Sequence, residues 1–185
     1  MHVGEYILVL VSIVLGLALT DLAFSTHRLI RRRADVEFDA APVLAALLAA
    51  YLVCANFWGD YRHYRTVTSA SLWATLPNLA ILFVNFLIAA AALPDEWHGK
   101  IDLWQHYLAT RRQFWILVAI GTLTALVYGA MNERLLPVSA YISAALVLAL
   151  AGALCITERR WVHIGLLCGL LAMMVVGNGD LMISG

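Results

Sequence analysis

Residues 5–29 read EYILVLVSIVLGLALTDLAFSTHRL, and this stretch decides the fold. A helix needs about 20 mostly apolar residues to cross the hydrocarbon core of a bilayer, and this run is long enough. It ends in Arg31, Arg32 and Arg33 rather than in a small-residue cleavage site. We therefore expect a retained transmembrane helix and not a signal peptide. The run also carries a carboxylate, Asp21, where hydrocarbon is expected.

The composition is that of a membrane protein. Hydrophobic residues make up 63% of the chain and charged residues 13%, whereas a soluble domain carries about 25% charged residues. The 12 basic residues balance the 12 acidic ones, so net charge gives no reason to expect a nucleic-acid partner. The three cysteines lie in apolar runs without metal-binding spacing, and we expect them to be packing residues.

Six runs are long and apolar enough to span a bilayer, and no strand-like alternation of polar and apolar residues replaces them. The sequence therefore predicts an all-α polytopic membrane protein, organised as one transmembrane helical domain over residues 1–185. The predicted spans cover residues 5–29, 41–60, 72–93, 113–132, 136–157 and 161–178.

One connection is longer than the others and predicts a short interfacial helix over residues 102–111. Asp102 and Gln105 have the spacing of a capping box. Apolar residues then recur on one face, with Trp104 and Tyr107 among them. Aromatic residues of this kind anchor helices at the membrane surface, so we expect this segment to lie in the headgroup region.

Charge placement predicts the orientation, because Lys and Arg gather on the cytoplasmic side. Six spans put three basic residues on one side, namely Arg62, Arg65 and Arg134, and the other nine of the 12 on the opposite side. The side with nine is expected to face the cytoplasm of a bacterial inner membrane. Both termini are then expected outside the cytoplasm.

The first predicted helix has a stripe of small residues. Ser12, Gly16 and Thr20 follow one another at intervals of four, a spacing that lets helices approach closely. We favour helix packing as the role of this stripe over a polar pathway. Asp21 points in a neighbouring direction, and because an ionised acid in hydrocarbon is costly, we expect it to face the interior. A transport role and a structural pair with an arginine both remain open for it.

Depth along the predicted spans groups the remaining polar residues. An inner cluster would contain Asp21, His27, Glu158 and His163. Asn78 and Asn85 would give the third helix one polar face between this cluster and an outer one. The outer cluster would contain Glu5, Asn56, Asp60 and His63. Such a series could line a route for protons or cations, or it could consist of ordinary polar residues at helix ends that bridge neighbouring helices.

Motifs for chemistry are absent from the sequence. There is no GxSxG, no HExxH and no glycine-rich phosphate loop. Asp60 and His63 have a spacing that zinc ligands use, but two ligands are too few for a specific site. No catalytic residue, metal or cofactor is therefore predicted, and a membrane-embedded enzyme has no motif in its favour.

The segment from Tyr6 to Asp21 resembles the start of small bacterial multi-pass membrane proteins of uncharacterised activity. The later residues Leu93-Pro94-Asp95-Glu96, Ile101-Asp102-Leu103 and Arg111-Arg112 share this resemblance. The resemblance implies a multi-pass membrane fold and no particular activity, so it assigns a role to no residue.

Two functional hypotheses follow from the sequence. The first is a small oligomeric channel or transporter for protons or small cations, with Asp21 as the titrating group. The second is a non-catalytic accessory or scaffold subunit of a larger membrane complex, with the small-residue stripe as its docking face. In both, the partners are the lipid bilayer and either further copies of the chain or other subunits.

Overall fold

The computed structural model describes residues 3–69, 71–132 and 136–177. The described part of the chain forms six helices long and apolar enough to cross a membrane. The prediction of an all-α polytopic membrane protein is therefore confirmed. The helices are α1 (Val3–Arg31), α2 (Ala40–Tyr64), α3 (Leu72–Ala92), α4 (Leu103–Asn132), α5 (Val138–Ile156) and α6 (Arg160–Gly177).

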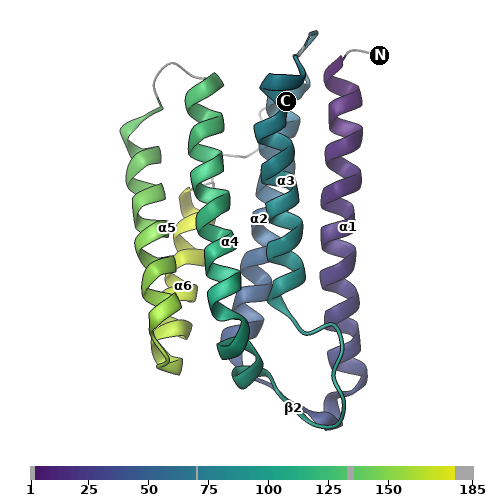
Figure 1. Ribbon diagram of the computed structural model, residues 1–185, viewed down its shortest axis with the longest axis vertical. Coiled ribbons are helices and arrows are strands. Elements are labelled where there is room, and N and C mark those ends of the chain that lie inside the picture. Colours follow the sequence, from purple (N-terminus) through teal and green to yellow (C-terminus); the bar gives the residue numbers. More distant parts are fainter. Residues whose placement is uncertain (1–2, 70, 133–135, 178–185) are drawn as a thin grey trace.

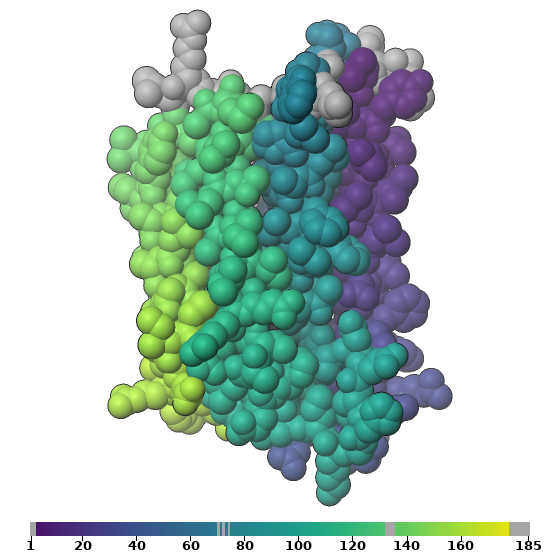
Figure 2. All heavy atoms as spheres, in the orientation of Figure 1, coloured from purple at the N-terminus to yellow at the C-terminus, as the bar shows by residue number. Residues whose placement is uncertain are grey.

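The helices run alternately up and down between two ends of the bundle (Figure 1). We call the end at which α1 begins the N-terminal end. At the opposite end, β1 (Val36–Glu37) and β2 (Ile101–Asp102) form a two-stranded parallel sheet, with Val36 opposite Ile101; we call this the strand end. The sheet joins the α1–α2 connection, which includes a 3-10 turn η1 (Arg33–Asp35), to the α3–α4 connection. Figure 2 shows the teal segment between α3 and α4 covering this end of the molecule.

Carboxylates cap two helices at the strand end. The side chain of Asp39 accepts a hydrogen bond of 2.8 Å from the Ala41 backbone N–H at the start of α2. Asp102 accepts from the backbone N–H groups of Trp104 and Gln105, at 2.8 and 3.2 Å. These bonds satisfy N–H groups that have no partner within the helix. The predicted cap at Asp102 is thereby confirmed.

The prediction of a separate interfacial helix was wrong, because residues 102–111 and the fourth span belong to one continuous helix, α4. Tyr107 is 3% exposed and belongs to the core instead of anchoring a surface helix. Buried residues recur at helical spacing on both sides of Arg111 and Arg112, so the helix continues through the two arginines. The buried face comprises Leu103, Tyr107, Arg111, Phe114, Trp115 and Val118.

The length of α4 explains how this helix can begin with polar residues. Its 30 residues extend about 45 Å at 1.5 Å per residue, whereas the hydrocarbon core is about 30 Å thick. The first turns of α4, at the strand end, can therefore lie beyond the hydrocarbon. The 29 residues of α1 exceed the same thickness.

Helix α2 holds the bundle together, since it packs against α1, α3, α4 and α6. Its buried face is rich in alanine, including Ala41, Ala45 and Ala49, all fully buried. Small side chains let neighbouring helix backbones approach closely in a membrane. In Figure 1, α1 stands at one side of the bundle and α5 and α6 stand at the other.

Candidate functional site

A buried acid lies near the N-terminal end of the bundle. Asp60 of α2 is 6% exposed, and Asn78 of α3 lies beside its carboxyl group. Neither Asp60 Oδ2 nor Asn78 Nδ2 has a hydrogen-bond partner. Among the residues that the structure describes, no Lys, Arg or His forms an ion pair with Asp60. Because an unpaired carboxylate is costly to bury, this site favours a carboxyl group that holds a proton or binds a cation.

Two tyrosine side chains lie near the buried acid. Tyr64, one turn after Asp60, is 3% exposed, and its hydroxyl lies 3.0 Å from that of Tyr128 on α4. The His63 ring stands edge-on to both tyrosine rings, with centroid distances of 4.8 and 6.2 Å. We call Asp60, His63, Tyr64, Asn78 and Tyr128 the Asp60 cluster. It brings side chains from α2, α3 and α4 together at one level of the bundle.

A cavity of about 540 Å³ lies between helices α2 to α6. Most of its wall is apolar, and polar side chains come from Asn56 on α2, Asn85 on α3, Thr122 on α4 and Ser143 on α5. Asn85 is 5% exposed, and its Nδ2 has no hydrogen-bond partner. Since Asn78 and Asn85 lie seven residues apart on one face of α3, this face carries amides at the Asp60 cluster and at the cavity.

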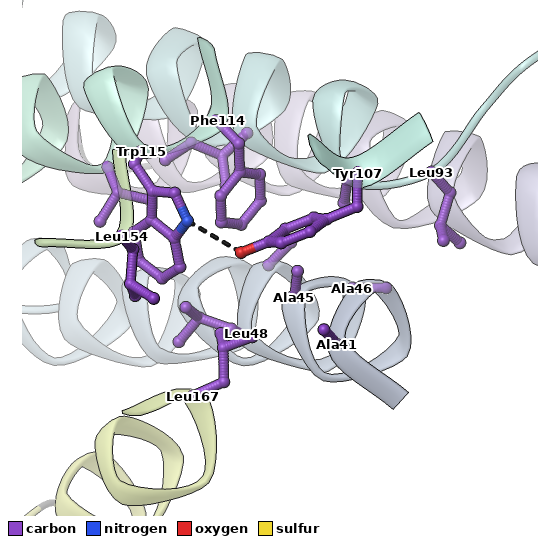
Figure 3. Packing of buried hydrophobic residues seen from close by; sticks show 14 of the residues in the cluster. Ala41, Ala45, Ala46, Leu48, Leu93, Tyr107, Phe114, Trp115, Leu154 and Leu167 are labelled. Atoms are coloured by element: carbon purple, nitrogen blue, oxygen red, sulfur yellow. Dashed lines mark hydrogen bonds between the residues drawn. The ribbon is translucent and has the colours of Figure 1, made fainter. Parts of the chain in front are cut away.

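Toward the strand end, a packed core closes the interior. Phe114 and Trp115 of α4 are buried there against Leu48, Leu154 and Leu167 (Figure 3). These side chains belong to one continuous apolar cluster, and apolar side chains packed in this way exclude water. The polar groups of the N-terminal half therefore do not continue as an open pore through this core.

His163 lies in this core and is fully buried. Its Nδ1 is 2.9 Å from Tyr107 Oη, and its Nε2 is 2.9 Å from the Thr157 carbonyl oxygen. Trp115 Nε1 donates a 3.0 Å hydrogen bond to the same tyrosine oxygen (Figure 3). The Trp104 ring also packs against the imidazole at a steep angle, with 5.5 Å between the ring centroids. Every one of these partners comes from α4 or from the connection between α5 and α6.

Asp21 occupies a different environment from His163. It is partly exposed on α1, and its electrostatic neighbours are Arg28 and Asp95. Asp95 lies in the α3–α4 connection, where its Oδ1 accepts a 2.7 Å hydrogen bond from Ser25 and lies 3.5 Å from the Arg28 guanidinium. The expectation that Asp21 faces the interior is thus met only in part, because the side chain is partly exposed.

The other residues of the predicted inner cluster are dispersed. Glu158 is largely exposed and forms a 2.9 Å ion pair with Arg111. His27 is exposed and borders an apolar groove between α1 and α2. The structure therefore does not gather Asp21, His27, Glu158 and His163 around one point.

In the predicted outer cluster, Asp60 is buried, His63 is exposed and packs against Tyr64 and Tyr128, and Asn56 lines the neighbouring cavity. Glu5 is exposed in the first turn of α1. The stripe of Ser12, Gly16 and Thr20 is also exposed, and each hydroxyl donates to a carbonyl of its own helix, at 2.7 Å. No other helix of the described chain covers this stripe.

Sequence reasoning missed the aromatic members of these sites. Tyr64 follows Asp60 by four residues, and Trp115 follows Tyr107 by eight, so helical spacing alone could have placed each pair on one face. The pairing of Tyr64 with Tyr128, and of Tyr107 with His163, depends on which helices are neighbours, and no sequence signal reveals that.

Comparison with known proteins adds no assignment: no family model, no curated protein and no solved structure matches this chain. Within the described residues, no three His, Cys, Asp or Glu side chains are grouped so that they could hold a metal ion.

Proposed function

We propose that this chain is a small membrane transport protein that moves protons or small cations, with Asp60 as the group that binds the transported ion. The carrying observation is that Asp60 is buried and its Oδ2 is unpartnered. A carboxyl group in such a place gains stability by holding a proton or by coordinating a cation. Polar and ionisable groups inside a membrane bundle commonly mark ion routes.

The amides of α3 support this proposal. Asn78 lies beside Asp60, and Asn85 continues the same helix face into the cavity. Either amide can hydrogen-bond to water, and the oxygen of the Asn78 amide can coordinate a cation at Asp60. The packed core around Trp115 closes the strand end, so the proposal is a transporter that must change conformation, rather than a permanently open channel.

In this proposal Asp60 takes the role that the sequence suggested for Asp21. Asp21 is partly exposed and has an arginine, Arg28, among its electrostatic neighbours. Its partial exposure distinguishes it from Asp60, which is buried and whose described surroundings contain no ion-pair partner.

Flux into liposomes tests the proposal. Purified protein is reconstituted in liposomes that contain a pH-sensitive dye or a sodium- or potassium-sensitive dye, and a gradient is imposed. We expect flux of at least one of these ions with the native chain, background flux with Asp60→Asn, and retained flux with Asp21→Asn. Absence of flux of all three ions in the native chain contradicts the proposal. Flux that depends on Asp21 and not on Asp60 contradicts the assignment of the site.

The same proposal places the protein in a bacterial inner membrane with both termini outside the cytoplasm. The basic residues support this orientation, because Arg28 and Arg31 lie in the last turn of α1, and Arg160 begins α6, all toward the strand end. Positive charge near helix ends favours the cytoplasmic side. Labelling of single cysteines introduced at Asp35 and Gly59 by a membrane-impermeant reagent checks the orientation in cells.

An accessory or scaffold subunit is the alternative, and the exposed α1 stripe favours it. Ser12, Gly16 and Thr20 leave a face on which another helix could pack closely. The occupant would be a second copy of the chain or a subunit of a larger complex. Purification in a gentle detergent followed by mass spectrometry shows which of these two occupants is bound. Recovery of a partner protein, combined with an absence of ion flux in liposomes, would favour this alternative.

A further inference from the structure

The cavity lined by α2, α3, α4, α5 and α6 is large enough to hold a small molecule. Its volume of about 540 Å³ lies within the range of about 300–1,000 Å³ that is typical of ligand pockets. Five helices contribute to its wall, so the space is not a groove along one helix pair, and its lining residues Ala125 and Ser143 are exposed where it opens to the surface of the bundle. Like most ligand sites, it combines apolar walls with a few polar groups.

The chemistry of the wall favours an uncharged ligand over a bound ligand that carries a charge. Of the described residues that line the cavity, none is an Asp, Glu, Lys, Arg or His. A charged molecule would therefore enter a place of low polarity without a counter-charge, which is unfavourable. An uncharged ligand with a large apolar part fits walls made by residues such as Ile88, Val118 and Val147.

One polar group on the wall lacks a partner. Asn85 is 5% exposed, and its Nδ2 makes no hydrogen bond. Thr122, by contrast, already donates its hydroxyl to the Val118 carbonyl at 2.8 Å. Because the two ends of a carboxamide exchange by rotation about the Cβ–Cγ bond, the Asn85 amide can present its N–H group to the cavity. A buried donor without a partner favours a ligand that supplies an acceptor.

We propose that this cavity binds an uncharged, lipid-soluble molecule whose carbonyl oxygen accepts a hydrogen bond from the Asn85 amide. The apolar part of the ligand lies against the wall formed by α3, α4 and α5. This inference does not rest on ion transport, because binding is measured without a gradient.

The test compares two probes that differ mainly in the acceptor oxygens. A decyl-substituted benzoquinone carries carbonyl groups, and decylbenzene lacks them. Binding to the purified full chain is measured by native mass spectrometry in detergent. We expect the quinone to bind the native chain about fivefold more tightly than the hydrocarbon, as one neutral hydrogen bond implies.

Two substitutions test separately the hydrogen bond to Asn85 and the volume of the cavity. With Asn85→Leu, we expect the two probes to bind equally, and retained decylbenzene binding shows that this variant is folded. Ala125 lines the cavity and Ala130, on the same helix, does not. We therefore expect Ala125→Phe to abolish binding of both probes, and Ala130→Phe, its matched control, to leave binding unchanged.

Three results would overturn the proposal: no quinone binding by the native chain, equal affinities of the native chain for the two probes, or quinone binding that persists unchanged in both Asn85→Leu and Ala125→Phe. Each of these results is independent of the liposome experiment. The cavity proposal can therefore fail while ion transport stands, and the reverse also holds.

Discussion

Tyr107 Oη lies 2.9 Å from His163 Nδ1, and this contact joins α4 to α6 inside the apolar core. A carbonyl oxygen can only accept, so the bond to Thr157 places the hydrogen of a neutral imidazole on Nε2. Nδ1 is then an acceptor, and the Tyr107 hydroxyl donates to it. The same hydroxyl accepts from Trp115 Nε1. These groups form a continuous chain of hydrogen bonds whose members are all satisfied at these atoms.

Tyr107→Phe is expected to lower stability, because it deprives both Trp115 Nε1 and His163 Nδ1 of their partner. Leaving a buried polar group unpaired costs about 1–3 kcal/mol. The thermal unfolding midpoint in detergent, followed by tryptophan fluorescence, measures the loss. Tyr141→Phe is the matched control, because Tyr141 is exposed on α5. Equal midpoints for the two variants would contradict this account.

Asp39→Ala is expected to destabilise the strand end more than Asp39→Asn. Asp39 is buried, caps α2 and forms an ion pair with Arg160 at the start of α6. The alanine variant loses both interactions, and loss of a helix cap alone costs about 0.5–2 kcal/mol. Asparagine keeps a capping oxygen and loses the charge. Unfolding midpoints should therefore fall in the order native, Asp39→Asn, Asp39→Ala, whereas Asp35→Asn, at an exposed position, should match the native chain.

Gly4→Ala and Gly59→Ala are expected to act in opposite directions. A Cβ atom at Gly4 would clash with the Tyr64 carbonyl oxygen, whereas one at Gly59 would meet nothing within 4 Å. The first substitution must push the start of α1 away from the end of α2, at a cost of about 1–3 kcal/mol. The second removes a glycine from a helix and should stabilise it by about 0.5–1 kcal/mol. A midpoint that rises for both would show that α1 does not pack here.

Gly16→Leu tests whether α1 supports self-association. Nothing lies within 4 Å of a Cβ atom at this position, so the fold of one chain should tolerate leucine. If copies pack through the stripe, the bulky side chain will separate them, and native mass spectrometry will detect more monomer. Gly152→Leu on α5 is the control, because its surroundings are equally open. An unchanged distribution of oligomers in Gly16→Leu would exclude the stripe as the contact.

The sequence predicted the helices well because length and hydropathy determine membrane spans. It failed at Arg111 and Arg112, which interrupt the apolar run without interrupting the helix. Arg111 is tolerated in the core because its guanidinium donates to the Leu108 carbonyl and to Glu158. A hydropathy scale counts the charge of arginine but not its hydrogen-bond acceptors. The prediction therefore divided α4 into residues 102–111 and 113–132.

The candidate site was predictable only where residues of one helix were concerned. Helical spacing placed Asn78 and Asn85 on one face of α3, and both are buried in the structure. Depth along the chain then grouped Asp21 with His163, although their described neighbours differ. Depth fixes one coordinate of a side chain, and the position around the bundle depends on how the helices pack.

The small sheet also has a consequence for the order of assembly. The strands that pair through Val36 and Ile101 are separated by about a third of the chain. During synthesis, β1 is therefore made well before β2, and α2 and α3 are made between them. The two strands can pair only after α1, α2 and α3 have been made. Until then, the α1–α2 hairpin must be stable without the sheet.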